Sequence, residues 1–147
     1  MKPKLGLKLM GAFMVVFPAA GLLYFWRDAH LRVEKSGMAY VGSEVRAVLE
    51  AWDKTKLQED GTLALRQSDV PSRFEAAGAK LGALRSLGPW TVERVWAGSR
   101  DDMVWQFVRA RAGAEYANGQ ATVVVTVARR TMAPEWRIES LQFDSAD

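Results

Sequence analysis

The first 26 residues carry the least ambiguous pattern of hydrophobic and polar positions in the chain. From Leu9 to Trp26 no charged side chain occurs. A helix of this length spans about 27 Å at about 1.5 Å per residue, close to the thickness of a bilayer's hydrocarbon core. Polar residues do not recur at helical spacing within the run, as they would on a soluble amphipathic helix. The pattern therefore predicts a single transmembrane helix over residues 9–26.

The flanks of this run resemble the two interfaces of a bilayer. A lysine precedes it, and an aromatic cluster followed by an arginine closes it, so we expect membrane-interface positions at Lys8, Tyr24, Phe25, Trp26 and Arg27. Small side chains let another helix approach closely. We accordingly expect helix contacts at Gly11, Ala12, Ala19, Ala20 and Gly21.

A cleaved secretory signal is the alternative interpretation of this segment. The apolar core of a signal peptide is usually about 7–15 residues long and ends in small residues. Here the run is longer and ends in aromatic residues, although Ala19 to Gly21 form a small-residue patch inside it. Whether the segment is ever cleaved stays open. A lipoprotein anchor is excluded because the chain contains no cysteine.

Helical periodicity dominates the next part of the chain. Residues 27–35 are polar and read as a stem that Ser36 and Gly37 should interrupt. A first domain helix is predicted from about Gly37 to Leu57, with an apolar face at Met38, Val41, Val45, Val48, Leu49 and Trp52. After an irregular stretch, Ser72 and Glu75 match a capping box that would start a second helix, ended by Gly88 and Pro89.

The last third of the chain alternates hydrophobic and polar positions. Four strands are predicted, at Trp90–Ala97, Met103–Ala112, Gln120–Arg130 and Glu135–Phe143. Short separators make consecutive strands antiparallel, and the long helix should cover one face of the resulting meander. The predicted fold class is therefore α+β. Its parts are a basic tail (1–8), a transmembrane helix (9–26), a stem (27–35) and one extracytoplasmic domain (36–147).

The distribution of charge indicates an orientation. Lys and Arg number 20 and Asp and Glu number 17, and three lysines among the first eight residues account for the whole excess. The positive-inside bias then places the tail in the cytoplasm and the domain in the periplasm, anchored to a bacterial inner membrane. Because the remaining chain is electrically balanced, the basic pI does not indicate a nucleic-acid partner.

Few residues could support catalysis or metal binding. His30 is the single histidine and lies in the stem, which excludes a histidine triad or a multi-histidine metal site within one chain. Asp101 and Asp102 follow Gly98 and are better explained as a hairpin turn than as a cation site. We expect no catalytic, cofactor-binding or metal-binding residues, and hence no enzyme.

The order of elements resembles the cystatin-like and nuclear-transport-factor-two-like cone fold. The resemblance rests on the segment from Tyr116 to Val127 and on the closing segment from Glu135 to Phe143, in which a tryptophan opens the last strand. The resemblance implies a helix-plus-antiparallel-meander cone; it does not imply an activity, because enzymes, ligand binders and assembly modules share this fold. A membrane-anchored form also resembles the assembly-platform subunit of type IV secretion systems.

The expected function follows from these patterns. We expect a single-pass membrane accessory, assembly or scaffold subunit of a larger complex. It should contact membrane lipid, and it should bind other subunits through both its periplasmic domain and its membrane helix. The alternative is a tethered domain that binds a small apolar ligand. The partner's identity and homo-oligomerisation stay open. Residues predicted to line a pocket or an interface are Tyr40, Trp52, Trp96, Trp105 and Tyr116.

Overall fold

A computed structural model describes residues 4–145, with side chains described from Gly21 onward. The chain divides into two compact units, one ending at Arg32 and one beginning at Val33. The helical elements are α1 (Lys4–Tyr40), the π-helix η1 (Val41–Val45), α2 (Arg46–Ala51), α3 (Lys54–Glu59), α4 (Leu63–Gln67) and α5 (Val70–Leu81). The strands are β1 (Leu84–Leu87), β2 (Thr91–Arg100), β3 (Met103–Tyr116), β4 (Gly119–Arg130) and β5 (Arg137–Ser145).

The first unit consists of the N-terminal part of α1. Over the residues whose side chains are described, no helix is both long and apolar enough to span a membrane. The part of the predicted span from Leu9 to Ala20 lies outside the residues whose side chains are described. The same holds for the predicted site residues Lys8, Gly11, Ala12, Ala19 and Ala20. The rest of the span is helical, and the side chains of its five large residues, Leu22 to Trp26, are 69–73% exposed.

The second unit is an α+β domain built on an antiparallel meander. β3 pairs with β4 and β4 with β5, while β1 and β2 share the other edge of β3. Gly88 continues this edge between β1 and β2 by donating its N–H to Gly113 O at 2.8 Å. The β2–β3 turn is formed by Asp101 and Asp102, whose φ angles of 52° and 58° suit a tight type I′ hairpin.

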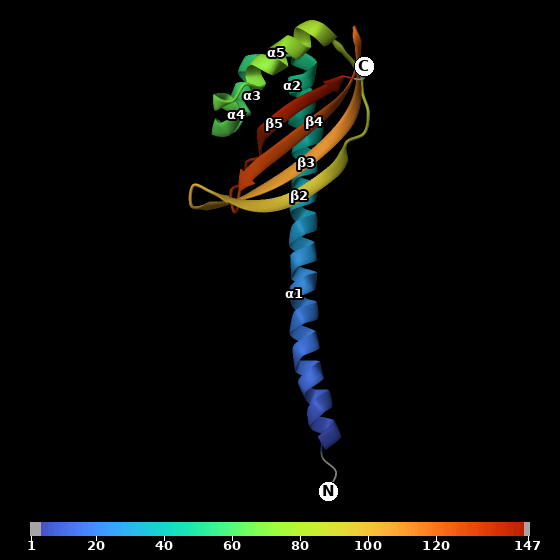
Figure 1. Ribbon diagram of the computed structural model, residues 1–147, viewed down its shortest axis with the longest axis vertical. Coiled ribbons are helices and arrows are strands. Elements are labelled where there is room, and N and C mark those ends of the chain that lie inside the picture. The colour runs from blue at the N-terminus through green and yellow to red at the C-terminus, as the bar shows by residue number, and fades with distance from the viewer. Residues whose placement is uncertain (1–3, 146–147) are drawn as a thin grey trace. The chain divides into compact units, whose positions relative to one another are not determined.

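The helix formed by η1 and α2 covers one face of this sheet, as the helical period predicts (Figure 1). Val41, Val45, Val48 and Leu49 are fully buried. Alternation along the strands brings every second residue to this inner face, where the fully buried strand residues are Val108, Ala110, Val123, Val125, Val127 and Ile138. Burial of these aliphatic side chains is the main source of the domain's stability.

The short helices α3, α4 and α5 gather beyond the β5 edge (Figure 1). Helix α3 buries Leu57, α4 buries Leu65, and α5 buries Phe74 and Leu81 together with Val70 and Pro71. The α3–α4 connection also pairs with β5, since Thr62 donates its N–H to Ile138 O at 2.9 Å and Ile138 donates to Asp60 O at 2.8 Å. These bonds occupy part of an edge that would otherwise be open to another strand.

The predicted interruption at Ser36 and Gly37 is wrong, because α1 continues to Tyr40 and leads directly into η1. Tertiary contacts explain the continuity. A Cβ on Gly37 would lie 2.7 Å from Val108 Cγ2, so the absence of a side chain lets the helix approach β3 closely. Ser36 Oγ accepts a hydrogen bond from Trp136 Nε1 at 2.8 Å.

Three other predicted boundaries are also wrong. The domain helix ends at Ala51, before Leu57, because Trp52 takes a left-handed conformation with φ 49° and Asp53 caps α3. Helix α5 begins at Val70, with Pro71 in its first turn, so Ser72 lies within the helix and no capping box forms. The helix stops at Gly82 (φ 75°), well before Gly88.

Helix α4 lies in the stretch that was expected to be irregular. Its N-cap is Thr62, whose hydroxyl accepts a hydrogen bond from Leu65 N at 3.2 Å. The predicted strands are present, but β2, β3 and β5 extend beyond the predicted ends. The additional residues pair with the neighbouring strands. The alternation of hydrophobic and polar residues along one strand does not show how far its neighbour extends.

Candidate functional site

The sheet face opposite α2, called the outer face here, carries an unusual row of arginine and aromatic side chains. Alternation places Trp105 and Phe107 of β3 on this face, because Val108 and Ala110 point to the helix. The row consists of Arg94, Trp96, Phe107, Arg100, Trp105 and Arg130, contributed by β2, β3 and β4. We call it the arginine–aromatic row.

Neighbours in the row stack on one another. The Arg94 guanidinium lies 5.0 Å from the Trp96 ring centre, and Trp96 stacks on Phe107 at 5.0 Å with an interplanar angle of 10°. Arg100 lies over Phe107 at 5.5 Å and over Trp105 at 5.3 Å, and Arg130 lies 5.5 Å from Trp105. Each contact is within the range of a cation–π or aromatic interaction, so the row is ordered by its own members.

An ion pair crosses the sheet beside this row. Arg100 on β2 donates from its two terminal nitrogens, Nη1 and Nη2, to the carboxylate of Glu139 on β5, reaching over β3 and β4. The small side chain of Ala128, fully buried beneath, leaves room for this crossing. The hydrogen bond and the negative charge of Glu139 raise the pKa of Arg100 above its ordinary value, so the guanidinium stays charged.

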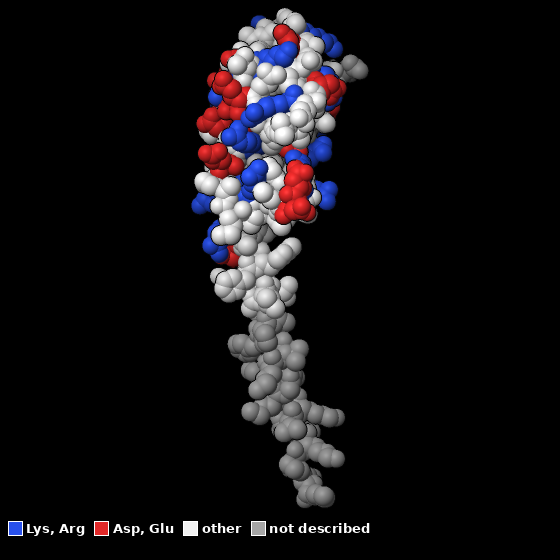
Figure 2. Space-filling view, turned by 90° about the vertical axis from the view of Figure 1, so that its left-hand side faces the viewer, with Lys and Arg blue, Asp and Glu red and all other residues white. Residues whose placement is uncertain are grey.

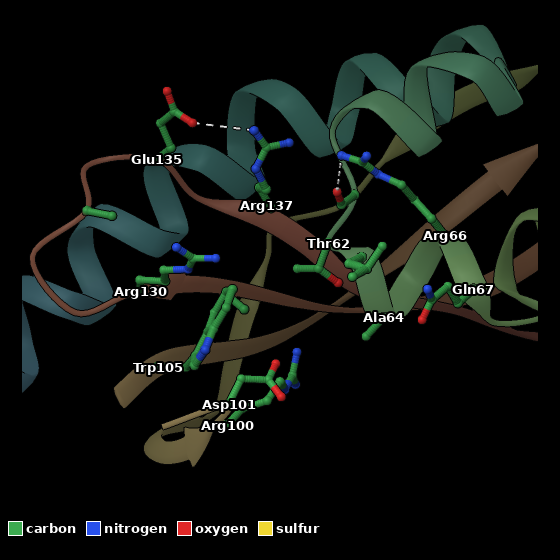
Figure 3. Close-up of a pocket in the computed structure, with 14 residues that line it drawn as sticks. Thr62, Ala64, Arg66, Gln67, Arg100, Asp101, Trp105, Arg130, Glu135 and Arg137 are labelled. Carbon is green, nitrogen blue, oxygen red and sulfur yellow. Dashed lines mark hydrogen bonds and ion pairs between the residues drawn. The ribbon is translucent and has the colours of Figure 1, made fainter. Parts of the chain in front are cut away.

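A pocket of about 510 Å³ opens where the row meets α4 (Figure 3). Trp105 and Arg130 lie on its strand side, and Arg66 and Gln67 on its α4 side. Its charged lining residues are Arg66, Arg100, Arg130, Arg137, Asp101 and Glu135. We call it the arginine pocket, since guanidinium groups outnumber carboxylates four to two in its lining.

The four guanidinium groups differ in how they are already bound. Arg100 is held by Glu139, and Arg137 contacts Glu135 at 3.4 Å and donates to Glu59 O at 3.0 Å. The Arg66 guanidinium makes one hydrogen bond among the residues that the structure describes, to Gly61 O at 3.1 Å. Within the described part of the chain, Arg130 has no ion pair or side-chain hydrogen bond and is held only against Trp105. Arg66 and Arg130 therefore keep most of their five donors free.

Four of the five residues predicted to line a pocket or an interface lie in two different environments, and Tyr40 lies in a third. Trp96 and Trp105 lie together on the outer face, and Trp105 also lines the arginine pocket. Trp52 and Tyr116 instead belong to an inner aromatic cluster with Phe74 and Phe143, with ring centres 4.9–5.4 Å from Trp52. Both are packing residues, and Trp52 Nε1 donates to Gly82 O at 2.7 Å.

Two buried polar atoms lack a partner among residues 21–145. They are Nε1 of Trp105, a residue that lines the pocket, and the hydroxyl of Tyr116, in the aromatic cluster. Burial raises the pKa of Tyr116 to about 12, because the phenolate would have to form away from water. Tyr116 is therefore neutral at physiological pH.

Tyr40 lies apart from these groups, in a groove with Glu44, Asp60 and Arg137. Burial, reinforced by the negative charges of Asp60 and Glu44, raises the pKa of Tyr40 well above its ordinary value. A tyrosine in this state does not act as a base at neutral pH.

Charges of both signs are mixed on the surface of the domain. On the side shown in Figure 2, Lys and Arg side chains are interspersed with Asp and Glu side chains. Arg109 and Arg111, neighbours on one face of β3, both pair with Glu93, at 3.0 and 3.3 Å. In the described residues no group of three metal-ligating side chains comes together.

The arginines of the pocket were not identified from the sequence. Arg66 and Arg100 stand 34 positions apart in segments of different period, and no local motif joins them. The available signal was the alternation of Arg and aromatic residues along β2 and β3, which places them on one face once the register is known.

Comparisons with known proteins give little further information. No known family profile matches the chain, and no curated protein matches it in sequence. Among solved structures, the crystal structure of the Kfla4162 protein from Kribbella flavida matches with a TM-score of 0.40 and 10% sequence identity, over 80% of this chain and 93% of that chain. A likeness this low does not establish a shared family.

Proposed function

We propose that this chain is a single-pass membrane subunit that assists or scaffolds a larger protein complex, and that its domain acts by protein–protein interaction. The observation that carries the proposal is the helical segment Leu22 to Trp26, with side chains 69–73% exposed. Five consecutive helical residues point in every direction around the axis, so this segment has no polar face to turn toward water. Lipid contact would remove this apolar surface from water.

The proposed setting is the inner membrane of a bacterium. The charge-free run from Leu9 to Trp26 supplies the length for a span, and the lysines at positions 2, 4 and 8 place the N-terminus in the cytoplasm under the positive-inside bias. The domain then lies in the periplasm. Stacking of His30 on Trp26, at 5.6 Å, suits a position at the interface between lipid and water.

The outer face of the sheet supports an interaction role for the domain. Tryptophan and arginine are the residues most enriched at protein-interaction hot spots, and the arginine–aromatic row presents two of the former and three of the latter in contact with one another. Stacking limits their side-chain freedom before any partner binds, which lowers the entropic cost of association. We propose no catalytic role for the domain.

The alternative function, binding of a small apolar ligand inside a cone, is less well supported. We take the domain to be of the cystatin-like or nuclear-transport-factor-two-like type, in which such a ligand would sit between helix and sheet. Here that space is filled by fully buried side chains, among them Val45, Leu49, Val123 and Val125. The arginine pocket is lined by charged groups and would not suit an apolar ligand.

The membrane arrangement can be tested with reporter fusions after Asp147. A reporter enzyme that is active only outside the cytoplasm should be active, and one that is active only inside should not. The triple substitution of Lys2, Lys4 and Lys8 by Glu should weaken or invert the membrane orientation, because these residues carry the whole charge asymmetry. Replacing three domain residues, Lys54, Lys56 and Lys80, is the matched control. Cytoplasmic activity of the wild-type fusion would contradict the proposed topology.

The interaction role can be tested by recovering the tagged full chain from native membranes in mild detergent, followed by mass spectrometry. Partners should be recovered in stoichiometric amounts. A second variant, with Leu9 to Trp26 replaced by polyleucine, keeps an anchor but removes Gly11, Ala12, Ala19, Ala20 and Gly21. A sharp loss of partners in this variant would assign contacts to the helix, and undiminished recovery would assign them to the domain. Absence of any stoichiometric partner of the wild type would contradict the proposal.

A further inference from the structure

We propose that the arginine pocket binds a carboxylate-bearing segment of a partner protein, with Arg66 and Arg130 as the recognising groups. The proposal rests on the interaction function above and names the chemistry of its contact. It starts from the position of the pocket. Five separate segments meet there: the α3–α4 connection with α4, the β2–β3 hairpin, the end of β4, the β4–β5 connection and the start of β5.

Charge is the first argument for an acidic ligand. Beyond the first eight residues the sequence is balanced, yet the pocket lining has four guanidinium groups against two carboxylates. Two of these four groups, Arg100 and Arg137, are paired with Glu139 and Glu135. The remaining charged groups of the lining are Arg66 and Arg130, on opposite sides of the pocket (Figure 3), against the single carboxylate of Asp101, so the excess charge is positive.

Geometry is the second argument. A guanidinium group binds a carboxylate through two parallel N–H donors, and Arg66 and Arg130 keep such pairs of donors free within the described part of the chain. Stacking against Trp105 holds Arg130 in place at 5.5 Å, and the bond to Gly61 O anchors Arg66.

The surroundings favour a peptide over a phosphate group. Asp101 and Glu135 in the lining would repel a phosphate, which carries more negative charge than a carboxylate, and the balanced domain offers no wider positive field. The pocket lining also includes a large exposed apolar side chain, Leu63 of α4, which is 65% exposed. A peptide can place an apolar side chain on Leu63 while its carboxylates reach the arginines.

The test uses the full chain in native membranes and exploits the chemistry of lysine. The variants Arg66→Lys and Arg130→Lys keep the positive charge and introduce an amine. A water-soluble carbodiimide couples this amine to a carboxylate in direct contact and forms an amide bond. The water lost in the coupling is taken up by the carbodiimide, which becomes a urea. We expect mass spectrometry to find cross-links from positions 66 and 130 to Asp or Glu of a second protein. Cross-links only to Asp101, Glu135 or other residues of this chain would overturn the proposal.

Charge reversal supplies the second measurement. The double variant Arg66→Glu and Arg130→Glu should lower partner recovery by about tenfold or more, as expected for the loss of charge-assisted contacts. The matched control is Arg73→Glu, at an exposed position of α5 and paired with Asp69 outside the pocket, which should change recovery less than twofold. Circular dichroism of each purified variant checks that it is folded.

The outcomes separate this proposal from the broader one. If the double variant recovers partners as well as the wild type, the arginine pocket is not the contact and the interaction function stands. If the wild type recovers no partner, both proposals fall. If the double variant loses co-purifying phosphatidylglycerol while no cross-link to a protein forms, the pocket binds a lipid phosphate and the carboxylate assignment is overturned.

Discussion

The indole of Trp136 is tied to Ser36 by a hydrogen bond of 2.8 Å from Nε1 to Oγ, across 100 positions of the sequence. Arg129 reinforces this contact, because its guanidinium lies 4.7 Å from the Trp136 ring centre and donates to the same hydroxyl at 3.4 Å. The contact joins the last turns of α1 to the residue that precedes β5. Within the domain it therefore holds the last turns of α1 against the connection between β4 and β5.

Removing this hydroxyl should destabilise the domain. Ser36→Ala leaves the buried Nε1 of Trp136 without its acceptor, and we expect the free energy of unfolding to fall by about 1–3 kcal/mol. Urea titration of the full chain in non-ionic detergent, followed by tryptophan fluorescence, measures the change. The control is Ser43→Ala, whose exposed hydroxyl bonds only to the carbonyls of Ala39 and Tyr40 in its own helix. An equal loss in both variants would show that the contact with Trp136 is not responsible.

Two glycines of the same continuous helix should respond to alanine in opposite directions. Gly37→Ala would place a Cβ 2.7 Å from Val108 Cγ2, so we expect a loss of about 1–3 kcal/mol as β3 and the helix move apart. At Gly42 no atom lies within 4 Å of the added Cβ, and Gly42→Ala should stabilise by up to about 1 kcal/mol through helix propensity. Thermal unfolding by circular dichroism compares them. Stabilisation by Gly37→Ala would refute the close approach.

The aromatic cluster around Trp52 should contribute strongly to stability. Trp52→Ala removes ring contacts with Phe74, Tyr116 and Phe143 and the hydrogen bond to Gly82 O, so a loss of about 3–5 kcal/mol is expected. Glu50→Ala, on the exposed side of α2 beside Arg46, should change the free energy of unfolding by about 0.5 kcal/mol or less. Chemical unfolding followed by circular dichroism is the measurement. Equal losses would mean that Trp52 packs less tightly than described.

Stability should fall at alkaline pH because of buried tyrosine. The pKa of Tyr116 rises from 10.0 to about 12 on folding, so between these values the unfolded chain loses a proton that the folded chain keeps. The free energy of unfolding then decreases by about 2–3 kcal/mol from pH 10 to 12, and below pH 10 the group has no effect. Tyr116→Phe should flatten this decrease in urea titrations at pH 8 and 11.

A comparison with Tyr40 makes this measurement specific. Burial also raises the pKa of Tyr40, so Tyr40→Phe should flatten the alkaline decrease separately, and the double variant should flatten it further. At pH 8, Tyr116→Phe should change stability little, because the hydroxyl has no partner in the described residues. A pH dependence of Tyr116→Phe parallel to that of the wild type would contradict the assignment.

Local periodicity in the sequence determined the helices and strands that bury one face and expose the other. Val41, Val45 and Val48 recur at helical spacing and are fully buried against the sheet. The alternation of the last third likewise predicted four antiparallel strands, and the Asp101-Asp102 turn was correctly read as a hairpin. These features depend on residues close together in the sequence. A helix or strand with one apolar face can therefore be recognised before the surface that covers this face is known.

Tertiary structure decided the features that depend on distant residues. Locally, Ser36 and Gly37 predict a helix break, yet the helix continues through both. Val108 packs into the space left by the missing side chain of Gly37, and Trp136 donates a hydrogen bond to Ser36. The tryptophans illustrate the same limit. Trp52 lies in the inner cluster while Trp96 and Trp105 lie on the outer face, and composition cannot distinguish them. The arginine pocket exists only because strand register and the α3–α4 connection bring Arg66 and Arg130 to one cavity, and no spacing in the sequence encodes that meeting.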